Sequence, residues 1–373
     1  MRFSLALFSL LLPLFDLRTT TGQETASPPA ASASEEFFEP SDFAKVEKID
    51  IHVHIHCEDL DFVAMAKRDR FRFLNMAVWS NPDPNINAEK HRTVFLQYEG
   101  NKDRIIPVVS FPLENWDDAD WSEQTIAYLK EHFDRGAVGV KIWKNIGMTL
   151  RDQSGDLVMV DDPKLDPVIR YIQQRGRVLL GHLGEPKNCW LPLAEMTTNN
   201  DRSYFRENPQ YHMYLHPELP SYEAQIDARD RMLAKHPELT FIGCHLASLE
   251  WSVDEIAAFL DRFPNAVVGV AARMGQIQYQ SQKSRDQVVA FFLRYQDRIL
   301  YGTDTGIGRG DNMAEEYAST RAKWMRDWNY FSTNKSIAVP ELDKPVTGLR
   351  LPKSVIQKIY YHNAKRIFDQ SWN

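Results

Sequence analysis

Short apolar runs recur along the chain from residue 46 onward, and polar segments separate them. Because these runs are apolar throughout and do not alternate with polar positions, they suit parallel strands that are covered on both faces. We predict eight strands, over residues 46–54, 72–80, 104–111, 137–144, 177–184, 239–247, 265–273 and 298–306.

The segments between these runs carry the start and stop signals of helices. The signals are Ser122 as a cap with Gly136 at the end, residues 167–174 closed by Gly176, Ser221 before a segment that runs to His236, and Ser252 with Glu255 as a capping box. Eight strand–helix units in about 320 residues have the size and pattern of a (β/α)8 barrel. We therefore predict a single α/β domain with the TIM-barrel fold. A doubly wound open sheet is the alternative, but no glycine-rich phosphate loop follows the first strand.

The first 45 residues do not follow this pattern. Met1 and Arg2 precede an apolar run, residues 3–15, that is too short to span a bilayer. We expect a signal peptide over residues 1–22, a disordered linker over 23–45 and the barrel domain over 46–373. An uncleaved membrane anchor is the alternative. With cleavage, the protein is expected to be exported, periplasmic or secreted, without stable membrane insertion.

Composition narrows the class of partner. The formal net charge is −7, and no basic stripe is visible, so a nucleic-acid partner is not expected. The three cysteines are too few for a disulfide framework, and no C-x-x-C spacing suggests a cysteine metal site. A small-molecule substrate is expected, and a homo-oligomer is possible.

Candidate chemistry gathers at the predicted strand ends, where a barrel builds its active site. His52 and His54 end the first strand, and side-chain alternation points both to the same side, while His56 falls in the loop beyond. The other polar strand-end residues are His182 on the fifth strand, His245 on the sixth and Asp304 on the eighth. Three imidazoles and a carboxylate around a divalent ion leave an open position for water, as in catalytic sites. A strand with exposed histidines is the alternative for the first pair, and a capping role is the alternative for Asp304.

Six motifs together resemble a known family: IDIHVHIH (49–56), GAVGVKIWK (136–144), LLGHLGEP (179–186), HPELTFIGCHLAS (236–248), ILYGTD (299–304) and IYYHNAKRIF (359–368). This pattern is similar to that of the amidohydrolase superfamily, and within it the amidohydrolase-related group of metal-dependent hydrolases, lactonases and non-oxidative decarboxylases. The resemblance implies that His52, His54, His182 and Asp304 are metal ligands. It implies that His245 binds or polarises the substrate near the metal.

Lys141, on the fourth strand, has several possible roles. In relatives with two metals a carboxylated lysine on this strand bridges the ions. Otherwise Lys141 would neutralise a substrate carboxylate, or pack on the barrel wall and pair with an acid. We expect a mononuclear site over a dinuclear one. Zinc is the expected ion, and Mn, Fe, Co or Ni also suit these ligands.

The long connection over residues 184–220 is aromatic and is expected to form a wall or lid over the metal. We predict substrate-binding roles for Trp190 and Tyr211 in this loop, together with Arg273 and Lys141. The alternative is that the aromatic residues only pack the loop onto the barrel. Glu185 is expected to orient an imidazole.

These residues favour a hydrolase. Asp304 would accept the proton of the attacking water, and His245 would stabilise charge on the reacting oxygen. The expected substrate is an ester, lactone or amide of a small, cyclic or carboxylated compound. Decarboxylation of an aromatic or muconate-type acid is the alternative reaction. An exported binding protein without catalysis is a third hypothesis, but it would not need a full ligand set around an open position.

Overall fold

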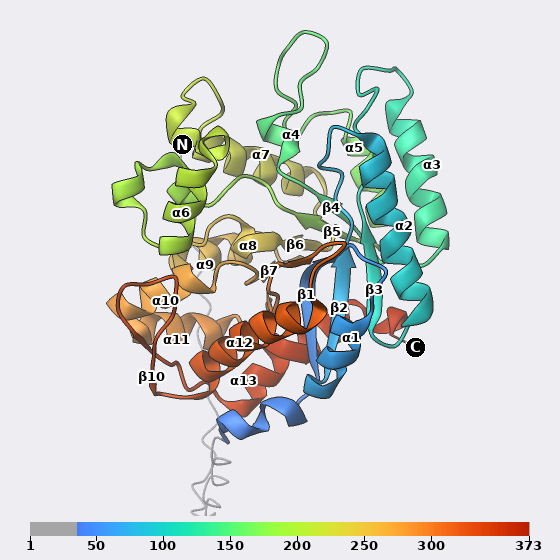
Figure 1. Cartoon of the computed structure of the whole chain (residues 1–373). Coiled ribbons are helices and arrows are strands. Elements are labelled where there is room, and N and C mark those ends of the chain that lie inside the picture. Colours follow the sequence, from blue (N-terminus) through green and yellow to red (C-terminus); the bar gives the residue numbers. More distant parts are fainter. Residues whose placement is uncertain (1–35, 373) are drawn as a thin grey trace, which may run out of the picture. The chain divides into compact units, whose positions relative to one another are not determined.

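The computed structural model describes residues 36–372, so the predicted signal peptide and residues 23–35 of the predicted linker lie outside the described residues. Parallel strands surrounded by helices form a (β/α)8 barrel, as predicted (Figure 1). The strands are β1 (Lys48–Ile55), β2 (Phe71–Met76), β3 (Ile105–Val109), β4 (Gly139–Ile142), β5 (Val178–Gly181), β6 (Phe241–Gly243), β7 (Ala266–Gly269), β8 (Ile299–Leu300) and β9 (Thr305–Ile307). Each of these strands overlaps one of the eight predicted runs.

The eighth strand of the barrel is split into two pieces. β8 pairs with β7, and β9 pairs with β1. Between the two pieces, the Ile51 amide donates to the Tyr301 carbonyl at 3.1 Å, and the Asp304 amide donates to the His52 carbonyl at 2.8 Å. The first and last strands therefore close the barrel, and Asp304 lies in the seam between them.

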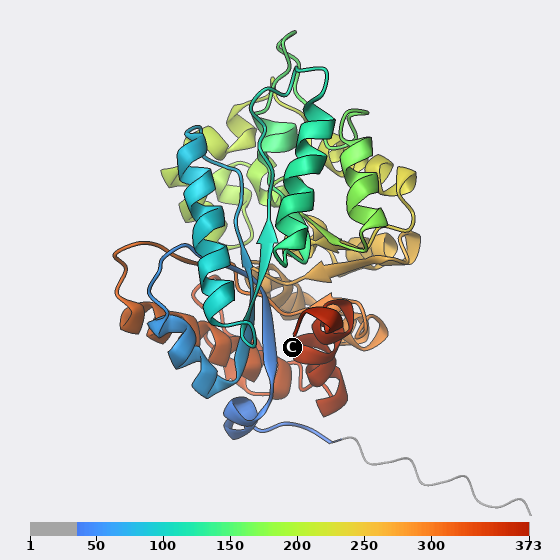
Figure 2. The ribbon, with the colours of Figure 1, turned by 90° about the vertical axis from the view of Figure 1, so that its right-hand side faces the viewer.

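Helices cover the outside of the strands, and α2 runs beside α3 in both views (Figures 1 and 2). The main helices are α1 (Asp61–Ala66), α2 (Pro84–Gly100), α3 (Trp121–Asp134), α5 (Asp166–Gln174), α7 (Tyr222–Lys235), α9 (Val253–Arg262), α10 (Met274–Lys283), α11 (Arg285–Arg294), α12 (Met313–Ser332), α13 (Lys353–Gln357) and α14 (Asn363–Ile367). Ser221 and Ser252 cap α7 and α9, as predicted. Ser122 is not a cap, because α3 already begins at Trp121 and the Ser122 hydroxyl donates to the Lys164 carbonyl.

The predicted linker ends too late in the sequence. Residues 36–45 are ordered and include a short helix, η1 (Pro40–Lys45). Phe38 and Phe43 are buried, and their rings lie 5.1 and 5.8 Å from that of Trp328 on α12. Two aromatic side chains thus gain enough burial to order a segment whose overall composition is typical of a linker.

The strands separate two apolar clusters. One fills the barrel interior and includes Ile51, Leu180 and Leu300, and the other lies between the strands and the helices. Cys57, Cys189 and Cys244 are buried and unbridged. Among residues 36–372, no helix has the length and apolar character needed to cross a bilayer.

Candidate active site

A bulge in β1 determines the side of the strand on which His52 and His54 lie. Ile49 belongs to the interior apolar cluster, whereas Val53 belongs to the cluster under the helices. The register of β1 against β2 shifts between Asp50 and Val53, where β1 has one more residue than β2. An extra residue reverses the side to which later side chains point. His52 and His54 therefore turn into the barrel mouth, although the residues before them follow the opposite alternation.

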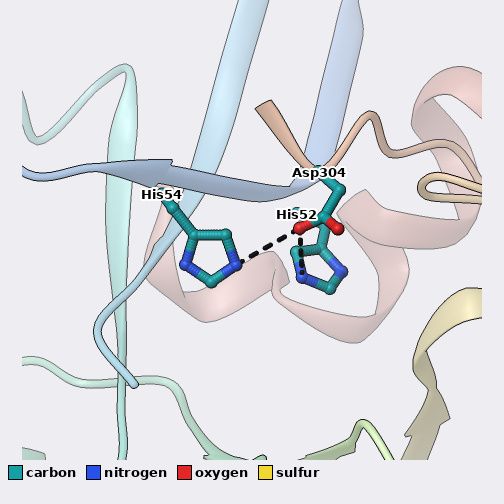
Figure 3. Close-up of side chains that lie close together, drawn as sticks. All are labelled: His52, His54 and Asp304. Carbon is teal, nitrogen blue, oxygen red and sulfur yellow. Dashed lines mark ion pairs between the residues drawn. The ribbon is translucent and has the colours of Figure 1, made fainter. Parts of the chain in front are cut away.

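His52, His54 and Asp304 meet at this mouth (Figure 3). The Asp304 Oδ1 atom lies 3.2 Å from His52 Nε2 and 3.3 Å from His54 Nε2. His54 Nδ1 lies 3.1 Å from the Met76 carbonyl, a position in which it donates and leaves Nε2 as an acceptor. One ligand atom from each of the three residues lies within 4.8 Å of the others. Three of the four predicted ligands are thus assembled in a geometry that fits one ion.

His182 and His245 line the same cavity of about 600 Å³. Their ring centroids are 4.2 Å apart, and the His245 centroid is 4.9 Å from that of His52. His245 Nδ1 contacts the Ala271 carbonyl at 3.0 Å, which leaves its Nε2 free for a substrate. His182 does not belong to the close group of three, so its role as the fourth ligand stays a prediction.

The protonation states of these residues suit a metal. Burial lowers the pKa values of His52 and His245 well below the usual range, with added repulsion from Lys141 and His182 respectively. Burial alone would raise the pKa of Asp304, but the adjacent His54 and His245 side chains hold that pKa below its usual value. Neutral imidazoles and an ionised carboxylate are the forms that bind a divalent ion.

Lys141 is buried on β4 beside the histidines. Its Nζ atom lies 3.4 Å from His52 Nε2. Among the described residues, no carboxylate lies within ion-pair distance of Lys141. The alternative role, in which Lys141 pairs with an acid on the barrel wall, is therefore wrong, and Lys141 lines the cavity.

The neighbouring lysine, Lys144, forms a buried ion pair with Glu185, which sequence reasoning missed. Glu185 also lies 3.5 Å from His182 Nε2, in line with its predicted contact with an imidazole. Burial by itself raises the pKa of Glu185, but His182 and Lys144 lower it to about 2. A signal was present in the sequence. The two residues stand three positions after Lys141 and His182, and β4 pairs with β5.

The predicted substrate-binding residues separate into three places. Arg273 lines the cavity; it is buried, donates from Nη1 to the Ala272 carbonyl, and has an Nε without a partner in residues 36–372. Tyr211 lines a neighbouring cavity. Trp190 is not among the described residues that line either cavity, because its indole donates to the Pro220 carbonyl and packs against Tyr222. For Trp190, loop packing is what the structure shows.

Helix α6 (Asn199–Glu207) supplies the predicted wall over the cavity. Asp201 anchors this helix, since its Oδ2 atom accepts from Asn188, Thr198 and Gln276 at 2.7 to 3.0 Å. Tyr204 and Phe205 of the same helix line the cavity, and neither is among the residues predicted to bind the substrate.

The backbone after β6 is strained at the candidate catalytic residue. His245, Leu246, Ala247 and Ser248 all have φ values of 56–58°, which form a left-handed turn. Such a conformation costs roughly 1–2 kcal/mol for each residue that is not glycine. Tyr222 on α7 and Ser248 itself hold the turn, through bonds to the Ser248 and Gly184 carbonyls at 2.6 and 3.1 Å. The sequence HLAS contains no glycine and gave no sign of this turn.

Solved structures that are similar to this chain include a decarboxylase and a hydratase. A complex of 2,6-dihydroxybenzoate decarboxylase with 2,6-dihydroxybenzoate is 16% identical, covers 87% of this chain and 99% of its own, and has a TM-score of 0.50. A decarboxylase structure of the same name from Rhizobium has the same identity and coverage with a TM-score of 0.49. 4-Oxalomesaconate hydratase from Rhodopseudomonas palustris is 12% identical, covers 87% of this chain and 97% of its own, and has a TM-score of 0.48. No curated protein matches the chain.

A family model described as Amidohydrolase matches residues 49–370. The match begins at the motif that carries His52 and His54 and extends through Asp304 to the end of the barrel. Since it covers nearly the whole described chain, this protein belongs to the amidohydrolase family.

Proposed function

We propose that the protein is a metal-dependent hydrolase. It activates water, which attacks an ester, lactone or amide of a small, cyclic or carboxylated substrate. The observation that carries this proposal is the convergence of His52, His54 and Asp304, with His245, in one cavity at the C-terminal ends of the strands. Two imidazole nitrogens and a carboxylate oxygen fit a divalent ion, with zinc as the first choice, and His182 is the proposed further ligand. When bound there, the ion would act as a Lewis acid and lower the pKa of water.

The chain's own residues divide the remaining work. Asp304, kept ionised, accepts the proton of the attacking water. His245, whose Nε2 faces the cavity, binds the reacting oxygen and stabilises its charge. Lys141 and Arg273 line the cavity, and neither forms an ion pair within residues 36–372, so they are available to orient a substrate carboxylate.

The same two charges favour a second candidate, decarboxylation of an aromatic acid, because a free carboxylate would be held by the same residues. The products separate the two reactions. Hydrolysis of a neutral ester or lactone at neutral pH releases a proton, whereas decarboxylation releases carbon dioxide. A panel of lactones, aryl esters and aromatic acids, offered to metal-reconstituted protein, decides between them.

Metal analysis tests the site directly. We expect about one ion per chain in the purified protein, and its loss in His52→Ala and Asp304→Asn. His56→Ala is the matched control, because its ring lies 5.8 Å from that of His54 but bonds to the Met76 carbonyl and lines a different cavity. Metal content that is unchanged in the first two variants, or lost equally in the control, contradicts the site.

We also propose export. The supporting observation is the positively charged start followed by the apolar run of residues 3–15. Expression of the full chain should yield an exported product whose N-terminus, read by mass spectrometry, lies near residue 23. A product that stays inside the cell with Met1 retained contradicts the proposal.

A further inference from the structure

A second cavity of about 550 Å³ lies beside the metal-site cavity. It is built by the loops that follow β2, β3, β4 and β5, so it opens at the same end of the barrel as the histidines. Its walls are largely apolar and aromatic, and include Trp79, Leu113, Met148, Tyr211, Met213 and Leu219. A volume of several hundred Å³ with apolar walls and a few polar groups is typical of a ligand pocket.

The two cavities share part of their walls. Trp143 and Lys144 line both of them. On one side Lys144 pairs with Glu185, which lines the metal-site cavity, and on the other its Nζ lies 4.6 Å from the centroid of the Tyr211 ring. The aromatic wall of the second cavity therefore begins next to a side chain that also lines the metal-site cavity.

Hydrogen bonds between different loops hold the walls of the second cavity in place. The Trp79 indole donates to Glu114 at 2.9 Å, and the Trp79 carbonyl accepts from Asn145 at 2.8 Å. These bonds tie together the loops after β2, β3 and β4. These bonds favour a preformed cavity, which lowers the cost of ordering its walls when a ligand binds.

We propose that the second cavity is a subsite for an apolar, aryl or alkyl part of the substrate, whose carboxyl-derived reacting group lies at the histidines. This inference rests on the proposed function and narrows the class of substrate. The substrate class is amphipathic, with a polar end for the metal-site cavity and an apolar arm for the second. Each methylene buried there is worth up to about fourfold in affinity.

Binding tests this subsite without catalysis. The probes are ω-phenylalkanoates of increasing chain length and the matching plain alkanoates, titrated by calorimetry into metal-reconstituted protein. We expect at least one phenyl compound to bind about tenfold or more tightly than its plain partner. Leu113→Trp and Leu219→Trp, which fill the cavity from two loops, should each reduce that ratio to about one. Leu293→Trp is the matched control, because Leu293 is an exposed leucine on α11, and it should keep the ratio.

Equal affinities within every pair in the unaltered protein overturn the subsite, as does a preference that survives in both filled variants. The proposed function fails in a different way. If the phenyl preference is present but no ester, lactone or amide is hydrolysed by the metal-loaded protein, the hydrolase assignment is wrong and the subsite stands.

Discussion

The Tyr222 hydroxyl donates a 2.6 Å hydrogen bond to the Ser248 carbonyl and thereby links helix α7 to the left-handed turn that carries His245. The same hydroxyl accepts from the Trp251 indole at 2.8 Å. Both tyrosine and turn are buried. The turn that positions His245 is therefore held by a residue that is not among the described residues lining the metal-site cavity.

Tyr222→Phe should lower kcat by about tenfold or more, because a small displacement of His245 would weaken its proposed bond to the reacting oxygen. It should also lower the free energy of unfolding by about 1 kcal/mol. Tyr330→Phe is the matched control, since it removes a buried tyrosine hydrogen bond to Ser281 far from the site. Steady-state kinetics and urea unfolding of both variants check this. Equal kcat values in the two variants would show that Tyr222 has only a structural role.

Arg273→Gln should raise KM for substrates that carry a carboxylate by about tenfold to a hundredfold, and change KM little for neutral esters. The reason is that Arg273 faces the cavity without an acid partner within ion-pair distance among the described residues. KM for a matched pair of charged and neutral esters measures the effect. Arg262→Gln, at an exposed arginine on α9, is the control. A KM increase of the same size for both esters would exclude carboxylate recognition by Arg273.

Lys144→Met should destabilise the protein by about 3–5 kcal/mol, because it leaves the Glu185 carboxylate buried without its cation. Adding Glu185→Gln to this variant should recover most of the lost stability. Lys130→Met removes an exposed pair with Asp134 on α3 and should cost less than about 0.5 kcal/mol. Chemical unfolding of the two single variants at residues 144 and 185 and of the double variant gives the coupling energy. Purely additive effects would contradict a coupled buried pair.

Asp327 should make stability depend on pH. Burial raises its pKa from 3.8 to about 7, while its Oδ2 atom accepts from the Tyr301 hydroxyl at 2.8 Å. Between pH 4 and 7 the folded protein keeps a proton that the unfolded chain has lost, so the contribution of Asp327 to stability falls as pH rises. Asp327→Asn should remove this part of the slope, on the order of a few kcal/mol across the window.

Asp261→Asn is the control for that experiment, because Asp261 also accepts from a tyrosine hydroxyl, that of Tyr295, but is exposed. Unfolding free energies at several pH values separate the two variants. If both have the same pH dependence as the unaltered protein, the Asp327 carboxyl does not titrate in this window.

The fold was readable from the sequence because parallel strands covered on both faces leave uninterrupted apolar runs, and all eight runs became strands. The meeting of His52, His54 and Asp304 followed from the rule that strand ends share one rim. The bulge after Asp50 was not readable. Uninterrupted alternation correctly puts His52 and His54 on the same side of the strand, but it wrongly puts Ile49 on the opposite side from them. Nothing in IDIHVHIH marks the extra residue.

The long loop over residues 184–220 was the least predictable part. Its aromatic content correctly indicated a wall, but which rings face a cavity depends on tertiary packing. Trp190 packs against Tyr222, whereas Tyr211 lines the second cavity and Tyr204 lines the metal-site cavity. The left-handed turn at His245 was hidden for a related reason. Bonds from distant residues stabilise it, and no local glycine does.

The closing seam of the barrel sets an order of events during synthesis. His52 and His54 leave the ribosome early, but Asp304 follows about 250 residues later and reaches them only when β9 pairs with β1. A nascent or truncated chain that ends before this seam holds two histidines without their carboxylate. A divalent ion held by all three side chains would therefore stabilise only a chain in which β9 has paired with β1.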